Sequence, residues 1–258
     1  MNTANNSSIN NAITGFLLNT KAKSTRNIHQ LVLRCFCEFT FNESDYLNAD
    51  WSQINKQKIL EFITNKKETV KFNTANNYLS ILKVFAQECF HCGVIDSLTY
   101  SSIINIPKYK GAKGDSGRAL SSREIIKIKG YFSEARTARE IRNNAIFILS
   151  ICCGLRRAEL SGLNTDNIKG NSITIKGKGD KTRNGYLSPI AKKSLNQWLK
   201  KRGNEKGALF THILKGDHVK NQRLGVKGIH YIIMDSYKKC KLNAFTTQDL
   251  RRTFATTL

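Results

Sequence analysis

The stretch that decides the fold is CGLRRAEL, residues 153–160, which joins a long apolar segment to a short basic one. Apolar side chains dominate residues 141–153, and their number and spacing predict a buried helix. Gly154 is expected to break that helix, because glycine is a poor helix former. Arg156 then stands at the start of the next helix, with Glu159 one turn further on. A guanidinium at a helix N-terminus predicts a phosphate-binding site.

A second motif, IKGKGDKTR at residues 175–183, follows closely. Short strands are expected at 172–175 and 185–189, with a Gly/Lys turn between them. The glycines of this turn allow the backbone to approach DNA. Lys178, at the tip, is predicted to reach a scissile phosphate and to donate a proton. Further DNA contacts are expected from the basic side chains in and beside the motifs: Lys176, Lys181, Arg183, Arg157 and Arg252.

The third motif is TTQDLRRTFAT, residues 246–256. Gln248 and Arg251 lie three positions apart, so they share one face of the predicted helix. Phe254 and Ala255 are expected to pack behind them. Taken singly, the three motifs have ordinary interpretations: a surface ion pair, a solvated basic loop and a helix surface.

Outward from the motifs, the chain divides into two parts of different pattern. Apolar residues recur at helical spacing through the first part, and we expect residues 1–108 to form a helical domain. Residues 109–118 contain glycines and lysines without apolar periodicity, which indicates a basic linker. Residues 119–258 mix helices and short strands, with a capping box at Ser121 and Glu124. The predicted fold class is mainly α with a small antiparallel β-sheet.

The charge points to a polyanion partner. The sequence has 42 Lys and Arg against 19 Asp and Glu, a formal net charge of +23. Before Gly111 the counts are 12 basic and 8 acidic residues, and from Gly111 onward they are 30 and 11. This distribution favours nucleic acid first and an acidic membrane surface second. A basic protein without such a partner is the alternative.

Other features exclude several classes of protein. The seven cysteines are odd in number and show no disulfide-framework spacing, which predicts reduced thiols and a cytoplasmic location. Cys89 and Cys92 have no second Cys/His pair at zinc-finger spacing, so we expect core packing there and no metal site. No stretch reaches the roughly 18 apolar residues that span a membrane. No membrane-spanning segment is therefore expected, and no membrane partner is predicted because the charge favours nucleic acid over an acidic surface.

Together the three motifs resemble the tyrosine recombinase (phage integrase) family in both order and spacing. The shared patterns are Gly-Leu-Arg-x-x-Glu-Leu, Gly-Lys-Gly-x-Lys-x-Arg and Leu-Arg-x-x-Phe-Ala-Thr. The helical first part resembles the SAM-like core-binding domain of that family, so the resemblance covers nearly the whole chain. It implies a helical core-binding domain followed by an α+β integrase-type catalytic domain.

The resemblance also implies roles for individual residues. Arg156 and Arg251 match the two catalytic arginines, which would hold the non-bridging oxygens of the scissile phosphate. Glu159 matches the acidic residue that orients the first arginine. Lys178 matches the hairpin lysine, the general acid for the departing 5′ oxygen. No metal or cofactor is implied, because the arginines supply the positive charge.

The sequence departs from the family pattern at two places. Gln248 stands where the family has His or Lys, and glutamine cannot exchange a proton near neutral pH. The chain also ends at Leu258, before the position of the nucleophilic tyrosine, and Tyr186, Tyr231 and Tyr237 all precede Arg251. No residue of this chain is thus expected to serve as the nucleophile. A truncated piece, a natural fragment and an interrupted gene all fit.

The expected function is site-specific DNA recombination or integration, as in a mobile element. Double-stranded DNA is the expected partner, held in a two-domain clamp, and the family acts as homotetramers. A chain that ends at Leu258 is expected to bind DNA without exchanging strands. One alternative is a non-catalytic DNA-binding protein that competes for recombination sites. Another is a nonspecific nucleic-acid-binding protein whose motifs arose by chance.

Overall fold

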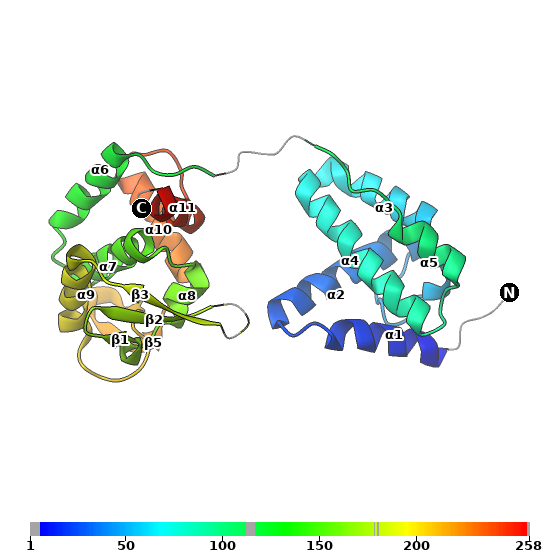
Figure 1. Ribbon diagram of the computed structural model, residues 1–258, viewed down its shortest axis with the longest axis horizontal. Helices are drawn as coiled ribbons and strands as arrows, with labels where there is room; N and C mark the ends of the chain where they lie inside the picture. Colours follow the sequence, from blue (N-terminus) through cyan, green and yellow to red (C-terminus); the bar gives the residue numbers. More distant parts are fainter. Residues whose placement is uncertain (1–5, 112–116, 178, 180, 257–258) are drawn as a thin grey trace. The chain divides into compact units, whose positions relative to one another are not determined.

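The computed structural model describes residues 6–111, 117–177, 179 and 181–256. The chain forms two compact units, Met1–Lys113 and Gly114–Leu258 (Figure 1). The division falls inside the basic segment that the sequence indicates as a linker, of which residues 112–116 lie outside the described part.

The first unit consists of helices in its described residues, as the apolar spacing predicts. The long helix α4 packs against each of the other α-helices of the unit. The elements are α1 (Asn6–Leu18), α2 (Lys23–Phe41), the 3-10 turn η1 (Trp51–Gln53), α3 (Lys56–Thr69), α4 (Phe72–His91) and α5 (Ser97–Ile104). Asn55 and Asp96 cap α3 and α5 through their side chains, which accept hydrogen bonds from backbone amides.

Aromatic rings fill the centre of this unit. Trp51 is fully buried and lies 4.5 Å from the Phe85 ring and 5.8 Å from the Phe36 ring, measured between centroids. Its indole N–H donates to the carbonyl of Tyr46 at 2.8 Å, so the buried ring leaves no polar atom unsatisfied. Cys89 is also buried in this core, and no group of described residues in the chain could hold a metal ion.

The second unit combines helices with two small antiparallel sheets, which confirms the predicted fold class. β1, β2 and β3 form one sheet in that order, and β4 pairs with β5. The elements are α6 (Ser122–Ser133), α7 (Ala138–Cys153), α8 (Arg157–Gly162), η2 (Thr165–Asn167), β1 (Ile168–Lys169), β2 (Ser172–Lys176), β3 (Thr182–Tyr186), α9 (Pro189–Arg202), β4 (Thr211–Ile213), η4 (Lys215–Asp217), β5 (Val219–Arg223), α10 (Val226–Lys239) and α11 (Thr247–Thr256).

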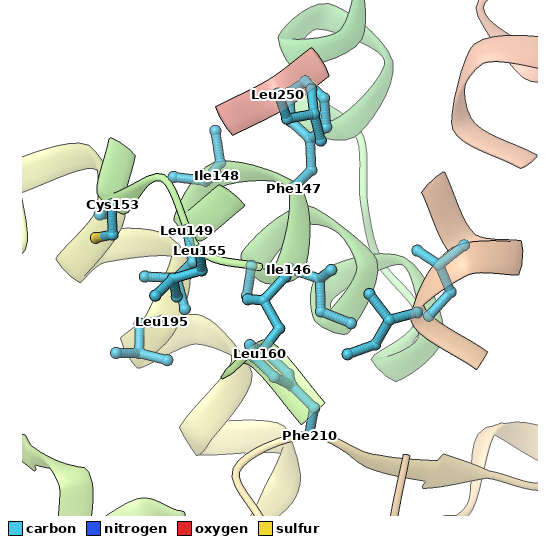
Figure 2. Packing of buried hydrophobic residues seen from close by; sticks show 14 of the residues in the cluster. Ile146, Phe147, Ile148, Leu149, Cys153, Leu155, Leu160, Leu195, Phe210 and Leu250 are labelled. Atoms are coloured by element: carbon cyan, nitrogen blue, oxygen red, sulfur yellow. The ribbon is translucent and has the colours of Figure 1, made fainter. Parts of the chain in front are cut away.

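The apolar helix α7 runs through the centre of this unit, in contact with α6, α9, α10 and α11. Figure 2 shows its residues Ile146–Leu149 among side chains from α8, α9 and α11. Burial on several faces explains why its sequence is apolar almost throughout its second half. The turn that leads from α7 to Arg156 therefore begins at a firmly packed helix end.

The hairpin of the first sheet differs from its prediction at the second strand. The strand expected at 185–189 is observed at Thr182–Tyr186, since Ser188 caps α9 and Pro189 occupies the first turn of that helix. Arg183 and Gly185 are half-buried along β3, while Thr182, Asn184 and Tyr186 are exposed. The capping box predicted at Ser121 and Glu124 is confirmed.

The segment before α6 is attached to α11. The backbone amide of Leu120 donates to the Thr253 hydroxyl at 2.8 Å. A Cβ atom at Gly117 would lie 1.9 Å from the Asp249 carboxylate, so the chain passes α11 too closely for any side chain. No helix in the described part of the chain is long and apolar enough to cross a membrane.

Candidate active site

The turn from α7 to α8 places Arg156. α7 ends at Gly154, as predicted, and Gly154 has φ +57°, a left-handed conformation that is common at the ends of helices. A Cβ atom at Gly154 would lie 2.5 Å from the Phe254 ring, so the position also requires glycine for its close approach to α11. Leu155 is fully buried and anchors the turn, which leaves Arg156 exposed at the N-cap of α8.

Glu159 forms the buried centre of a cluster of arginines. Its side chain is 4% exposed, against 54% for Arg156 and 40% for Arg183. Arg156 donates to it from Nη1 at 2.8 Å and from its backbone amide at 2.9 Å. Arg183 donates from both terminal nitrogens, each at 2.9 Å. Burial alone raises the pKa of Glu159, but these hydrogen bonds outweigh burial and hold the pKa at about 2.

Arg251 reaches the same cluster from α11. Its Nη1 donates to the carbonyl of Gly154 at 2.7 Å and lies 4.0 Å from Glu159 Oε2. Burial, followed by repulsion from Arg156, lowers the pKa of the Arg251 guanidinium from its usual value. An arginine remains charged after such a shift near neutral pH, so this corner of the unit concentrates positive charge.

Arg156 and Arg251 line one pocket of about 400 Å³. The predicted residues Arg157 and Gln248 line it as well. The remaining lining residues come from α8, α10 and the segment that enters α11: Ala158, Val226, His230, Thr246 and Thr247. The pocket thus contains guanidinium, imidazole, amide and hydroxyl groups, which together suit an anion with several oxygen atoms.

The other predicted residues lie elsewhere or outside the described part. Lys178 is outside the described residues, so its distance from the pocket is not defined. Lys176 and Lys181 are exposed beside that turn, at the end of β2 and just before β3. Arg252, predicted to contact DNA, pairs with the buried Asp249 at 3.0 Å. Arg183 faces Glu159 and is not among the described residues that line the pocket.

Sequence reasoning missed His230 and the two threonines of the pocket. His230 lies on α10, in a helix whose sequence is amphipathic and basic, and no short motif distinguishes it. Thr246 and Thr247 stand directly before Gln248, so their proximity to the third motif was an available signal. His230 could be found only after folding, because 74 positions separate it from Arg156 and 18 from Gln248.

Comparison with known proteins identifies the group to which this chain is similar. The model of the phage integrase family matches residues 119–258. The tyrosine recombinase XerC of Caldanaerobacter subterraneus is 27% identical over 232 residues, covering 85% of this chain and 62% of that protein. XerC of Pseudomonas fluorescens is 37% identical over 93 residues, 34% of this chain and 29% of that protein. This chain therefore spans less than two thirds of the length of either relative.

Solved structures show the same fold at low sequence identity. A lambda integrase dimer bound to a COC′ core site matches with a TM-score of 0.73 at 15% identity, over 97% of this chain and 88% of that one. The Tn1549 transposon integrase, in complex with a circular intermediate DNA, matches with a TM-score of 0.74 at 13% identity, over 97% and 86%. A lambda integrase tetramer bound to a Holliday junction gives 0.71 at 15% identity, over 97% and 71%. Because the family model matches residues 119–258, more than half of the chain, the chain belongs to the phage integrase family of tyrosine recombinases.

Proposed function

We propose that this chain binds duplex DNA and holds one phosphodiester in the pocket lined by Arg156 and Arg251, for site-specific recombination. The observation that carries the proposal is the meeting of these two guanidinium groups, 95 positions apart in the sequence, at one pocket beside the buried Glu159. Two arginines can bind the non-bridging oxygens of a phosphate and stabilise the charge that grows during displacement.

The other groups of the pocket have supporting roles in this proposal. The amide of Gln248 and the hydroxyl groups of Thr246 and Thr247 can hydrogen-bond phosphate oxygens. His230 adds an imidazole, which can hydrogen-bond a phosphate oxygen beside Gln248. Lys178, outside the described residues, is proposed as the general acid for the 5′ oxygen.

In the proposed reaction a tyrosine hydroxyl attacks the phosphorus and loses its proton to solvent, while the bond between phosphorus and the 5′ oxygen breaks and that oxygen takes a proton from Lys178. The product is a 3′-phosphotyrosine, which a second strand later attacks in the reverse sense. No tyrosine occurs among the described residues that line the pocket. The proposal for these residues is accordingly phosphate binding and activation, with the tyrosine supplied from outside this set.

The relatives guide the proposal for partners. The two structures of lambda integrase and that of the Tn1549 integrase contain DNA, and one of them is a tetramer. By extension we propose that this chain acts on double-stranded DNA, with both units contributing to a clamp, and that four copies assemble in the complete synapse. The net charge of +23 supports the affinity for DNA.

The binding part of the proposal is tested by titrating a duplex at several salt concentrations. Arg156→Gln and Arg251→Gln should each weaken binding about tenfold and lower the slope of log K against log salt by about 0.9. Lys206→Gln is the matched control, since it removes one exposed charge that does not line the pocket. Equal losses in all three variants would show that only overall charge matters.

One alternative is supported by Gln248 and by the lack of a tyrosine among the described pocket residues: a DNA-binding protein that competes for recombination sites without cutting. Selection from a random pool of duplexes, followed by incubation with a nicked substrate carrying the selected sequence, separates the possibilities. A covalent protein–DNA product in a denaturing gel supports the recombinase. Specific binding without that product supports the competitor, and failure to select any sequence supports nonspecific binding.

A further inference from the structure

The carboxylate of Glu159 is fully occupied by donors. Each of its two oxygens accepts one hydrogen bond from Arg183 and one from Arg156, at 2.8–2.9 Å. A carboxylate offers about four acceptor positions, so no position remains for another donor. Arg251 Nη1, 4.0 Å from Oε2, donates to the carbonyl of Gly154 instead.

Arg183 is held in this arrangement by the hairpin. It pairs in register with Ile175, which is buried, and it lies on the inward side of β3. Gly177 follows β2 beside the same carboxylate: a Cβ atom there would lie 3.7 Å from Glu159 Oε1. The hairpin therefore directs the Arg183 side chain toward Glu159, and Arg183 is not among the described residues that line the pocket.

From this geometry we infer that Arg183 is a positioning residue: by occupying half of the Glu159 carboxylate, it keeps Arg156 and Arg251 directed into the phosphate pocket. The inference rests on the proposed function of that pocket. It replaces the expectation that Arg183 contacts DNA directly.

The consequence of losing Arg183 follows from the free acceptor positions. Two hydrogen-bond positions on a buried carboxylate would open within reach of neighbouring guanidinium groups. Arg156 would turn a second N–H toward Glu159, and Arg251, already 4.0 Å away, would move to it. Both movements withdraw donors from the pocket, because a buried carboxylate without partners is unfavourable.

Lysine at position 183 distinguishes positioning from direct contact. A lysine keeps the positive charge and can bind a phosphate as a point charge, but it cannot make the paired bonds of a guanidinium with a carboxylate. If Arg183 contacted DNA directly, Arg183→Lys would keep most of the affinity for phosphate. If Arg183 acts through Glu159, Arg183→Lys should lose most of the affinity for phosphate.

The experiment titrates the whole chain with inorganic phosphate, with chloride at equal ionic strength as the reference, and follows the arginine Nε–H signals by NMR. In the unaltered chain phosphate should shift the signals of Arg156 and Arg251 to saturation. Arg183→Lys should raise the apparent Kd for phosphate about tenfold, as expected when one charge-assisted hydrogen bond is lost. Absence of any phosphate response in the unaltered chain would count against the proposed function itself.

Arg223→Lys is the matched control. Arg223 lies in the same unit and donates to the carbonyls of Ser161 and Leu163, so its replacement also lowers stability without touching Glu159. Its phosphate Kd should stay within about twofold of the unaltered value, a smaller change than the loss of one hydrogen bond would cause. Unaltered affinity in Arg183→Lys, or equal losses in both variants, would overturn the inference.

A double-variant series covers the case in which Arg183→Lys does not fold. Glu159→Gln and the combination of Glu159→Gln with Arg183→Gln remove the carboxylate alone and then both partners. Without the carboxylate, removing Arg183 should cause no further loss of phosphate affinity. A further loss of about tenfold, the value of one charge-assisted bond, would assign Arg183 a direct contact and overturn the inference.

Discussion

The two units bury different kinds of side chain. The first is filled with aromatic and aliphatic groups, with Trp51 and Phe85 among its largest fully buried residues. In the described part of the chain, every buried Ser, Thr, Asp, Glu and Arg belongs to the second unit: Arg142, Ser150, Glu159, Ser161, Ser194, Thr211, Ser236, Thr247, Asp249 and Thr253. The second unit thus accepts the desolvation of polar groups, which costs free energy unless each is paired.

The location of those polar groups explains the difference. Glu159 orients Arg156, Thr247 lines the pocket, and Asp249 holds the start of α11 through hydrogen bonds from Thr246. Arg142 is also buried and donates to the carbonyl of Thr211. The first unit is therefore stabilised mainly by apolar packing, whereas the second combines an apolar core with a fixed array of charges.

The largest loss of stability is expected from removal of the Trp51 ring, which lies at the centre of the first unit. Trp51→Ala should destabilise that unit by about 3–5 kcal/mol, through the lost burial and the cavity left behind. Denaturant unfolding followed by circular dichroism measures the change, with Leu98→Ala, at a site 79% exposed, as the control. If the second unit lost equal stability, the two units would not be independent.

The second unit should respond strongly to a change at its turn. Gly154→Ala places a side chain in a left-handed conformation and against the Phe254 ring, which should cost about 2–3 kcal/mol. The same variant should weaken phosphate binding, because the Gly154 carbonyl holds Arg251. The double variant Gly154→Ala with Phe254→Ala tests how much of this loss comes from the clash with the Phe254 ring. Part of the stability should be recovered in the double variant. No recovery would mean that the backbone conformation alone causes the loss.

A smaller effect is expected from the pH dependence of stability. The pKa of Glu159 in the folded protein is about 2, below its ordinary value, so its ionised form is stabilised by folding. This contribution is present above the unfolded pKa, near 4.5, and is lost as the pH falls toward 2. Unfolding free energies at pH 7, 5, 4 and 3 should therefore decline less steeply in Glu159→Gln.

Glu124, whose pKa is also about 2, provides an independent comparison. Hydrogen bonds from Arg118 are the main cause of its low pKa. Glu124→Gln should likewise flatten the decline in stability, but it should leave phosphate binding unchanged, since Glu124 does not line the pocket. Loss of phosphate affinity in Glu124→Gln would contradict the prediction that only the carboxylate of Glu159 positions the arginines of the pocket.

The smallest change in stability should come from a glycine at a position that any residue can occupy. Gly130 lies within α6, and a Cβ atom there meets nothing within 4 Å. Gly130→Ala should raise stability by about 0.5–1 kcal/mol, because alanine restricts the unfolded chain and favours helix. Thermal unfolding measures this change in stability. Destabilisation by Gly130→Ala would contradict the explanation that backbone conformation and close contacts make Gly154 differ from Gly130.

Sequence reasoning succeeded where the deciding contacts are local. The periodicity of apolar residues predicts the helices of the first unit, and Gly154 marks the end of α7 because the requirement for a left-handed residue is a property of the turn itself. Arg156 and Glu159 are one helical turn apart, so their pairing follows from helix geometry. The capping box at Ser121 and Glu124 is local in the same sense.

The strand boundaries were less accessible. The observed β3 begins three residues before the expected strand, at Thr182, and includes Arg183. Alternation was weak there because Gly185 has no side chain to mark the inward side; a Cβ atom at that position would lie 3.1 Å from Ile173. A charged residue and a glycine on the inward side conceal the period of two on which strand prediction depends.

The helical pattern and the order of the three motifs follow from the amino-acid sequence, which also singles out Arg156 and Arg251 as the candidate phosphate ligands. Only the tertiary structure decided that Arg183 meets Glu159, that Arg252 meets Asp249 and that His230 joins Gln248 at the pocket. Helix spacing makes the pair of Arg252 with Asp249 possible, and the burial of Asp249 is a property of the folded unit. The physical reason is that a guanidinium binds whichever oxygen is close and poorly solvated, and burial is a property of the folded unit.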